Sequence, residues 1–323
     1  MKVALTGGSG VVGAAVLRQL VEAGHEVKAL ARLPKSGARV AELGGFPVPG
    51  DVLSPEPVRE LVDDCEVVFH VAGINEMCTA DPDRMWRVNV EGTRVVMNAC
   101  RDARVKRLVH TSSAVTMGES EDEIATEKTT HRGYFLSKYE ETKTAAERLL
   151  FEDSRGLDVV AVNPSSVQGP GRATGTGRLF LEAARGKLRF AYNSRFSLVD
   201  IEDCARGHLL AADEGRSGER YLLSGTILSV GEALELLGEV LGQEIGVRYL
   251  NRNVILGLAS IPEFLFGLLN KQPPICRESV RVMTHGHNYD GRRAERDLGL
   301  DYTPVRETVI RTVDWFRSEG LLE

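Results

Sequence analysis

The sequence predicts an α/β fold built on a doubly wound parallel sheet, followed by a smaller and mainly helical C-terminal lobe. Short apolar runs alternate with helical patterns over the first half of the chain, which is typical of βαβ units. A glycine-rich turn at 7–13 separates the first apolar run from the first helical pattern. After Pro164 the alternation loosens, and the last third of the chain is mainly helical in pattern.

The expected elements follow from these patterns. Because the strand-like runs are apolar throughout rather than alternating, we expect strands that are buried on both faces of the sheet. The expected strands are 2–6, 26–31, 67–71, 107–111, 157–163 and 221–223. The expected helices are 11–23, 58–63, 83–101, 137–153 and 305–317. We expect a first lobe of 1–166 plus about 198–225, and a second lobe of 167–197 plus 226–323.

The composition argues against several classes of protein. The 323 residues carry 40 Lys and Arg against 46 Asp and Glu, so the net charge of −6 argues against nucleic acid as a partner. Hydrophobic residues make up 42% of the chain, which excludes extensive disorder. The apolar run at 254–269 is too short to span a membrane and contains Pro262 and Glu263. We favour a core helix there, with an apolar cover over the substrate cleft as the alternative.

Five cysteines are scattered along the chain, and no two of them form a Cys-x-x-Cys pair. This pattern predicts free thiols in a reducing compartment rather than a disulfide framework or a zinc site. No apolar leader follows Met1, so the sequence predicts a cytoplasmic protein. The cysteines are Cys65, Cys78, Cys100, Cys204 and Cys276.

The turn at 7–13 has three glycines, Gly7, Gly10 and Gly13, at the spacing G-x-x-G-x-x-G. Glycine lets the backbone bend sharply and approach a pyrophosphate closely. The N-terminus of the following helix then offers free N–H groups and a partial positive charge to the anion. The strand–turn–helix context therefore predicts a dinucleotide site.

Arg32 ends the second expected strand, 19 positions after Gly13. An Asp or Glu near this place would bind the ribose hydroxyls of NAD. A guanidinium suits a 2′-phosphate instead, and Lys35 lies close behind, so the sequence favours NADP, with NAD as the alternative. Asp51 follows Gly50, after a further presumed strand without clear bounds, and its carboxylate is placed to accept a hydrogen bond from the adenine amino group.

Two Tyr-x-x-x-Lys patterns overlap, one at 134–138 and one at 139–143. On a helix, residues four apart share a face, so either pair could present a phenol and an ammonium to a cleft. A nearby positive charge favours the phenolate and lowers the pKa of a tyrosine, which suits acid–base work. Ser137 and Glu140 form a capping box that starts a helix at Lys138. This start favours the pair Tyr139 and Lys143.

Three hydroxyl residues, 111–113, lie at the carboxyl end of the strand expected at 107–111. The carboxyl end of a parallel strand is where doubly wound folds bind their ligands. Ser113 is therefore a candidate to donate a hydrogen bond to a substrate carbonyl oxygen, together with Tyr139.

These pieces, in this order, resemble the extended short-chain dehydrogenase/reductase superfamily, also described as the NAD-dependent epimerase/dehydratase family. The chain is similar above all to bacterial dihydroflavonol reductase-like proteins. The resemblance implies a Rossmann fold and covers essentially the whole chain. The motifs that carry it are TGGSGVVG at 6–13, HVAG at 70–73, NVEGT at 89–93, TSSAVTMG at 111–118, YEETK at 139–143, NPSSVQGPG at 163–171, SLVDIEDCARGHLLA at 197–211 and VDWFRSEGLL at 313–322.

The resemblance implies a role for each matching residue. Ser113 polarises the carbonyl, Tyr139 is the acid or base, and Lys143 lowers the tyrosine pKa and binds the nicotinamide ribose. It also implies a homodimer formed through the helices expected at 83–101 and 137–153. No metal ligand is expected. The expected cofactor-binding residues are Gly7, Ser9, Gly10, Val11, Val12, Gly13, Arg32, Lys35, Asp51, Val52, Val71, Ala72, Gly73, Asn89, Thr111, Ser112, Tyr139, Lys143, Pro164, Ser165 and Val167.

Other polar residues have simpler interpretations. His70 and His110, each near a strand end, are expected to be packed rather than catalytic. Asp203 is expected to cap the helix that follows it. His285 and His287 are close-spaced but lack a third metal ligand, so we expect a loop.

The favoured function is an NADP(H)-dependent oxidoreductase that interconverts an apolar or polycyclic ketone or aldehyde with its alcohol. A nucleotide-sugar epimerase or dehydratase with a retained cofactor is one alternative, and a non-catalytic cofactor-sensing protein is another. An epimerase needs basic residues for a diphosphate in the second lobe. The candidates are Arg172, Arg178, Arg185, Lys187 and Arg189.

Overall fold

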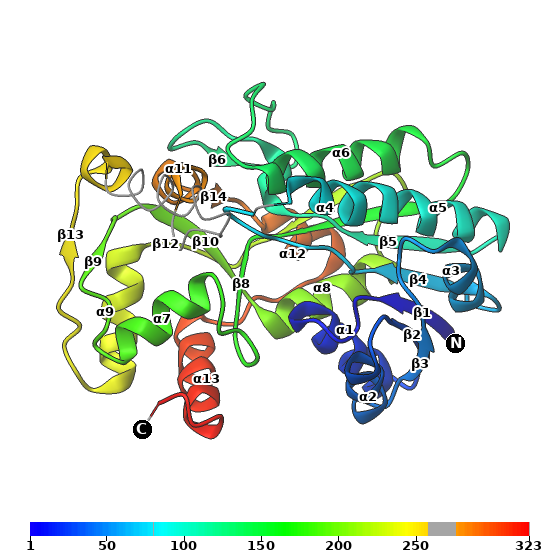
Figure 1. Ribbon diagram of the computed structural model, residues 1–323, viewed down its shortest axis with the longest axis horizontal. Coiled ribbons are helices and arrows are strands. Elements are labelled where there is room, and N and C mark those ends of the chain that lie inside the picture. The colour runs from blue at the N-terminus through cyan, green and yellow to red at the C-terminus, as the bar shows by residue number, and fades with distance from the viewer. Residues whose placement is uncertain (80, 258–275, 323) are drawn as a thin grey trace.

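A parallel sheet of seven strands forms the centre of the protein, in the order β11-β7-β5-β4-β1-β2-β3. A computed structural model describes residues 1–79, 81–257 and 276–322 (Figure 1). The order reverses between β1 and β4, so the predicted doubly wound sheet is confirmed and its switch point lies at β1. The strands are β1 (Lys2–Thr6), β2 (Glu26–Ala31), β3 (Phe46–Pro49), β4 (Val67–His70), β5 (Arg107–Thr111), β7 (Val159–Pro164) and β11 (Arg220–Leu223).

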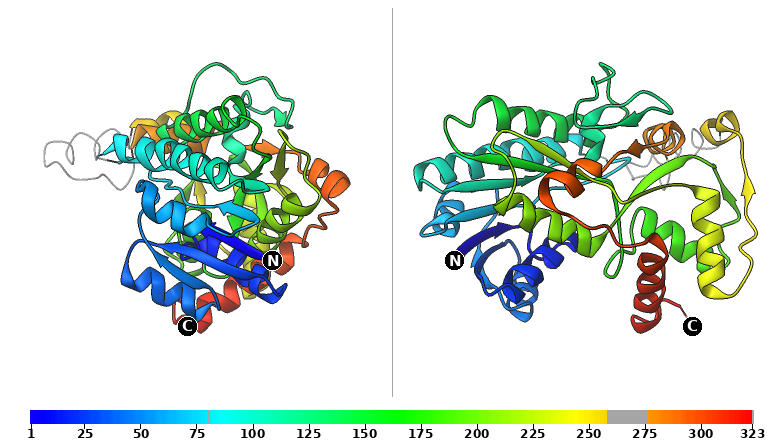
Figure 2. Two further views of the ribbon diagram at one scale, coloured as in Figure 1. Left: turned by 90° about the vertical axis from the view of Figure 1, so that its right-hand side faces the viewer. Right: turned by 180° about the vertical axis from the view of Figure 1, so that it is seen from behind.

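Helices cover both faces of this sheet, so its strands are buried as the sequence predicts (Figures 1 and 2). One face packs against α1, α2 and α8, and the opposite face packs against α3, α5 and α6. The bounds are α1 (Val11–Glu22), α2 (Pro34–Glu42), α3 (Pro55–Val62), α5 (Gly92–Asp102), α6 (Lys138–Glu152) and α8 (Ile201–Asp213). At the open edge, β3 carries Pro47 and Pro49, with Phe46 exposed.

The helix expected at 83–101 is observed in three pieces. It begins as α4 (Pro82–Trp86), widens into a π-helical turn (Arg87–Glu91) and continues as α5. Single π-helical turns inside α-helices occur often at functional sites. The turn contains Asn89, one of the predicted site residues.

A second sheet, in the order β12-β10-β8, lies beyond the carboxyl end of β7, and the sequence did not predict it. Its β10 pairs parallel with β8 and antiparallel with β12. A separate hydrophobic core joins it to three helices. The elements are β8 (Ser166–Gln168), β10 (Arg195–Asp200), β12 (Thr226–Ser229), α7 (Thr176–Ala184), α9 (Val230–Leu241) and α13 (Val305–Ser318). The helix expected at 305–317 is α13, and the division of the chain into two lobes remains a proposal.

Shorter elements complete the described chain. Two pairs of very short strands, β6 with β14 and β9 with β13, pair in parallel. These elements are a 3₁₀ turn (Ala114–Met117), β6 (Ile124–Ala125), β9 (Phe190–Ala191), β13 (Arg248–Tyr249), α11 (Arg277–His285), β14 (Asn288–Tyr289) and α12 (Arg292–Leu298). No helix within the described residues is long and apolar enough to cross a membrane. Most of the apolar run at 254–269 lies outside the described residues.

The prediction that Asp203 caps α8 is wrong. The strand β10 ends at Asp200, and the helix begins directly after it, so Asp200 is the capping residue. Its carboxylate accepts a hydrogen bond from the backbone N–H of Glu202 at 2.8 Å. Asp203 lies inside the first turn, where its carboxylate accepts from the backbone N–H of Thr303 at 2.6 Å and from the Thr303 hydroxyl at 2.9 Å.

Cys78 and Cys276 form a disulfide, with Cα atoms 5.8 Å apart. The expectation of free thiols holds for Cys65, Cys100 and Cys204, which are buried and unpaired, and is wrong for this pair. The two cysteines are 198 residues apart in the sequence, and only the fold brings the loop after β4 beside the start of α11.

A thiol count tests the disulfide. The unfolded, unreduced protein should present three free thiols, and five after reduction. Replacing both residues, as Cys78→Ser with Cys276→Ser, should lower the free energy of unfolding by about 2–4 kcal/mol, because the link closes a long loop in the unfolded chain. Reductant should then leave the stability of the double variant unchanged. Five thiols in unreduced protein would contradict the pairing.

Candidate active site

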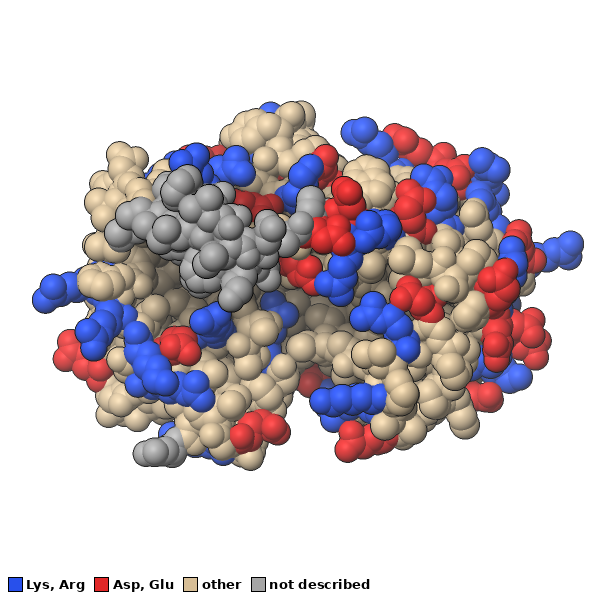
Figure 3. Space-filling model, in the orientation of Figure 1, with Lys and Arg blue, Asp and Glu red and all other residues tan. Residues whose placement is uncertain are grey.

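A cleft of about 1100 Å³ lies at the carboxyl ends of β1, β4, β5 and β7. Residues from the second sheet and from α7 and α11 line its other side. Its volume lies just above the usual range of about 300–1,000 Å³ for small-molecule sites. The surface of the protein is hollowed near the middle of Figure 3. This position, at the switch point of the sheet, is where doubly wound folds bind ligands.

The glycine-rich turn forms one end of the cleft, and its glycines are required by close contacts. A Cβ atom on Gly7, which has φ +77°, would lie 2.7 Å from the backbone nitrogen of Ala72. One on Gly13 would lie 2.1 Å from the Gly7 carbonyl oxygen. Gly10 precedes α1 without a side-chain cap, and Val11 and Val12 of the first helical turn line the cleft, so uncapped backbone N–H groups lie at this end of the cleft. The turn has the shape and polarity that a pyrophosphate requires.

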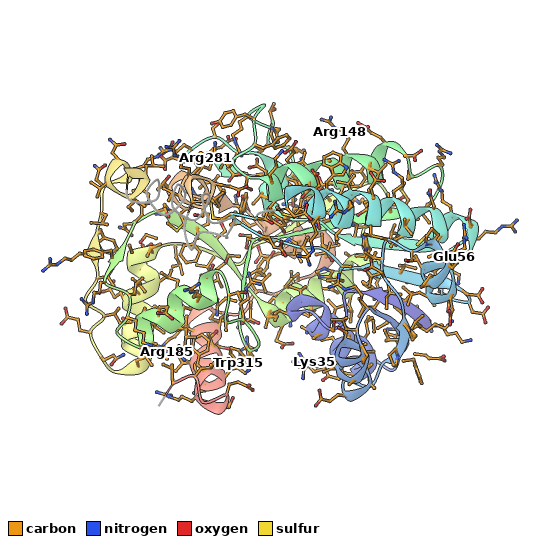
Figure 4. All side chains as sticks on the ribbon, viewed as in Figure 1. Lys35, Glu56, Arg148, Arg185, Arg281 and Trp315 are labelled. Carbon is orange, nitrogen blue, oxygen red and sulfur yellow. A yellow bond between two sulfur atoms is a disulfide. The ribbon has the colours of Figure 1, made fainter. Side chains whose placement is uncertain are left out.

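Arg32 and Asp51 both line the cleft, with Arg32 Nη1 and Asp51 Oδ2 3.8 Å apart. The Arg32 side chain is 55% exposed, which leaves its guanidinium accessible to a ligand. Lys35, labelled in Figure 4, is exposed on the first turn of α2 and does not line the cleft. Ser36 lines it instead. The sequence did not predict α2, so it gave no reason to select Ser36.

Ser113, Tyr139 and Lys143 all line the cleft. Ser113 follows β5, and the two other residues lie on the first two turns of α6. Lys143 is buried, and its ammonium donates a hydrogen bond to the Thr111 carbonyl oxygen at 2.6 Å. Burial lowers the pKa of Lys143 to about 8, against the nearby charge of Glu147.

Burial raises the pKa of Tyr139 above its usual value of 10. The Ser113 hydroxyl and the positive charge of Arg172 oppose this effect. The sequence suggested a pKa near neutrality, set by Lys143 and a bound nicotinamide. In the protein alone, burial is the larger effect, and the protonated phenol is the resident form at neutral pH.

The other tyrosine of the overlapping motifs takes no part in the cleft. Tyr134 lies in the loop before α6, is 58% exposed and does not line the cleft. The helix begins as predicted, because the Ser137 hydroxyl accepts from the Glu140 N–H at 3.1 Å. The capping box is only half formed, however. The Glu140 carboxylate accepts from the backbone N–H of Leu136 at 2.8 Å and pairs with Arg132.

Asn89 is buried behind the cleft rather than in its wall. Its amide nitrogen donates to the Thr142 hydroxyl and to the Ile74 carbonyl oxygen, both at 3.0 Å. Its amide oxygen accepts from the Ile74 N–H at 2.9 Å. The π-helical turn therefore ties the loop after β4 to the part of α6 between Tyr139 and Lys143.

The buried histidines are packed, as expected. His70 contacts the hydroxyls of Thr6 at 2.7 Å and Thr93 at 3.0 Å, and burial lowers its pKa to about 3. His110 is also fully buried, and burial lowers its pKa well below the usual value. Both rings are therefore neutral at physiological pH.

The loop expected at His285 and His287 is only partly confirmed, since His285 ends α11. His287 Nδ1 lies 2.7 Å from Glu119 Oε1, and His285 Nε2 lies 3.1 Å from the Glu119 carbonyl oxygen. Both rings therefore contact one buried glutamate.

Two hydroxyls in the cleft wall fit a polar ligand. The Ser112 and Ser165 oxygens are buried and have no hydrogen-bond partner among the described residues. Buried polar groups without a partner are rare in native proteins, so a bound group is expected to complete them. Apart from Lys35 and Asn89, the whole predicted set lines the cleft: Gly7, Ser9, Gly10, Val11, Val12, Gly13, Arg32, Asp51, Val52, Val71, Ala72, Gly73, Thr111, Ser112, Ser113, Tyr139, Lys143, Pro164, Ser165 and Val167.

The doubly wound sheet, with its glycine-rich turn at the switch point, defines a Rossmann-type dinucleotide-binding protein. Residues 3–224 match the model of the NAD dependent epimerase/dehydratase family, and the chain belongs to that family.

Three curated relatives cover nearly the whole chain. It is 32% identical to Sterol demethylase protein B of Methylococcus capsulatus, over 100% of both chains. It is 29% identical to a putative dihydroflavonol 4-reductase of Synechocystis, over 99% of this chain and 95% of the relative. It is 30% identical to a 2-alkyl-3-oxoalkanoate reductase of Stenotrophomonas maltophilia, over 94% and 95%. Among solved structures, gox2253 superposes with a TM-score of 0.86 at 28% identity, over 100% of this chain and 99% of the other.

Proposed function

We propose that this protein is an NADPH-dependent reductase that converts a ketone or aldehyde to its alcohol. The observation that carries the proposal is the convergence of Ser113, Tyr139 and Lys143 in one cleft beside the glycine-rich turn. Relatives named as reductases at 29% and 30% identity support it. A protein that only sensed its cofactor would have no need of a proton-transfer group in that position.

The cleft residues divide into groups that would hold different parts of the dinucleotide. Gly10, Val11 and Val12 would bind the pyrophosphate through backbone N–H groups. Arg32 would bind the 2′-phosphate, with Ser36 beside it on the first turn of α2. When bound, the reduced nicotinamide supplies a hydride to the carbonyl carbon.

The protein residues provide the proton and stabilise the developing charge. Tyr139 donates its phenolic proton to the carbonyl oxygen, and its raised pKa keeps that proton in place at neutral pH. Ser113 donates a second hydrogen bond to the same oxygen. Lys143, held by the Thr111 carbonyl, stabilises the phenolate that forms. These roles favour the direction of reduction.

The far half of the cleft favours an apolar substrate. Its walls there come from the second sheet and from α7, α9 and α11, and the large side chains in them are mainly apolar. They include Leu179, Leu188, Phe196, Val230, Val282 and Met283. An alkyl chain or a ring system would bury apolar surface against these residues.

Cofactor titration is the first test of this proposal. The wild-type protein should bind NADPH at least about tenfold more tightly than NADH, and Arg32→Ala should remove the preference, since a lost charge-assisted hydrogen bond costs about 1.5–3 kcal/mol. Lys35→Ala, outside the cleft, is the matched control and should keep it. NADPH should then be consumed in equal amount with a ketone or aldehyde. Equal binding of NADH, or tightly retained cofactor that is never consumed, would favour an epimerase or dehydratase.

We also propose a homodimer formed through α5 and α6, which sedimentation velocity would test. Trp86, which precedes this surface on α4, is 41% exposed. A cytoplasmic location remains a proposal. The disulfide between Cys78 and Cys276 would be unusual in a cytoplasmic protein, because disulfides are rare in reducing compartments.

A further inference from the structure

Arg172 is a cleft residue whose charge no acidic group of the described chain balances. It lies in the loop between β8 and α7 and lines the cleft together with Tyr139 and Ser113. Its Nε is buried and has no hydrogen-bond partner among the described residues. Burial lowers the pKa of this guanidinium, and only the Tyr139 phenol and the Cys204 thiol oppose the effect. No carboxylate within the described residues does so.

The other basic side chains of the cleft have partners or lie in solvent. Arg84 pairs with Glu76 at 2.6 Å. Arg32 pairs with Asp51, and Lys143 donates to the Thr111 carbonyl oxygen, as described above. Arg195 is exposed at the rim. As far as the described residues go, Arg172 therefore combines partial burial with an unpaired charge and a buried Nε that lacks a hydrogen-bond partner, which costs free energy unless a ligand completes it.

Two glycines of the loop, Gly175 and Gly177, lie so close to Arg172 that larger residues would collide with it. A Cβ on Gly175, which has φ +57°, would lie 3.1 Å from Arg172 Nη2. A Cβ on Gly177 would lie 2.1 Å from the Arg172 carbonyl oxygen and 3.2 Å from its Cγ. These two glycines let the loop close around the arginine.

We propose that Arg172 binds a carboxylate of the substrate, so that the compound reduced is an oxo acid with an apolar chain. This inference rests on the proposed reduction and narrows its substrate class. A planar guanidinium binds a carboxylate with two parallel hydrogen bonds. Because Arg172 lines the same cleft as Tyr139 and Ser113, the carboxylate would lie near the carbonyl that Tyr139 protonates.

The reaction balances without a change at the carboxylate. The carbonyl carbon gains the hydride of NADPH, the carbonyl oxygen gains the Tyr139 proton, and solvent reprotonates the phenolate. The name of the 2-alkyl-3-oxoalkanoate reductase relative describes a substrate of the same chemistry, a ketone close to a carboxylate.

The dinucleotide pyrophosphate is the competing anion. A Cβ on Gly171 would lie 3.9 Å from Val11, so the loop of Arg172 also borders the glycine-rich turn. The pyrophosphate already has its own site there, formed by backbone N–H groups at the N-terminus of α1. We therefore assign Arg172 to the substrate, and the experiment separates the two anions.

The test compares 3-oxododecanoate with its methyl ester in the presence of NADPH. The quantity measured is the ratio of kcat/KM for the acid to kcat/KM for the ester. Arg172→Gln should lower this ratio by about 100-fold, the size expected when a buried charge pair loses one partner. Arg172→Lys should give an intermediate ratio, because it keeps the charge without the planar fork. The matched control is Arg178→Gln, an exposed arginine on α7 outside the cleft, which should leave the ratio unchanged.

Each other outcome has a defined meaning. An unchanged ratio in Arg172→Gln would overturn the proposal. The same holds if the Kd for NADPH weakens about 100-fold while the ratio stays constant, because Arg172 would then bind the pyrophosphate. If the wild-type protein reduces neither compound, calorimetric binding of the acid to the NADPH complex decides. If the wild-type protein binds the acid tightly and Arg172→Gln abolishes this binding, the carboxylate site is supported although the proposed reduction fails. Absence of binding would overturn the site as well.

Discussion

Replacing Tyr139 with phenylalanine is expected to lower kcat for ketone reduction by about 10³-fold, because the positioned proton donor is lost. The variant keeps the aromatic ring in its half-buried place, so the melting temperature should change by only a few degrees. Steady-state oxidation of NADPH with the best carbonyl substrate provides the measurement.

Tyr134→Phe is the matched control, since Tyr134 belongs to the overlapping motif but is exposed outside the cleft. Its kcat should equal that of the wild type. If Tyr139→Phe retained more than about a tenth of the activity, Tyr139 would not be the proton donor.

Replacing Lys143 with methionine should lower kcat by about 10²-fold or more and should also remove a pH dependence of stability. In the unfolded chain, a lysine titrates near its ordinary value of 10.5, whereas the folded pKa of Lys143 is about 8. Between these values the unfolded state binds more protons, so the wild-type protein gains stability as the pH rises. The gain over that window amounts to about 3 kcal/mol and is absent below pH 8.

Urea unfolding of dinucleotide-free protein at pH 7 and at pH 10.5 measures this gain. The difference in free energy of unfolding between wild type and Lys143→Met should shift by about 3 kcal/mol in favour of the wild type at the higher pH. Because both proteins share every other titrating group, their remaining pH dependence cancels. A difference that does not change with pH would show that Lys143 keeps an ordinary pKa in the folded protein.

The sequence predicted most accurately the parts of the site that depend on local chemistry. The turn between β1 and α1 follows from three glycines spaced three positions apart within one short stretch of the chain. The start of α6 follows from the Ser137 cap, and this start distinguished Tyr139 from Tyr134. The central strands were recognisable because burial on both faces makes them apolar throughout.

Predictions from the sequence failed for features that depend on contacts between segments far apart in the chain. The partners of β10 lie in β8 and β12, far from it in the chain, and each strand is too short to show a pattern. The disulfide joins residues 198 positions apart. Arg172 was one of five basic candidates in the sequence, and only the fold shows that it lines the same cleft as Tyr139 and has no acidic partner among the described residues. Asp203 was assigned to a cap because the end of β10 was not foreseen.

The two prolines of β3 have a consequence for the behaviour of the protein at high concentration. As the outermost strand, β3 has one side free to pair with a strand of another molecule, and the exposed Phe46 would favour such contact. Pro47 and Pro49 lack the N–H groups that a new ladder would need. The edge therefore resists intermolecular sheet growth, and replacing both prolines would create a site of aggregation.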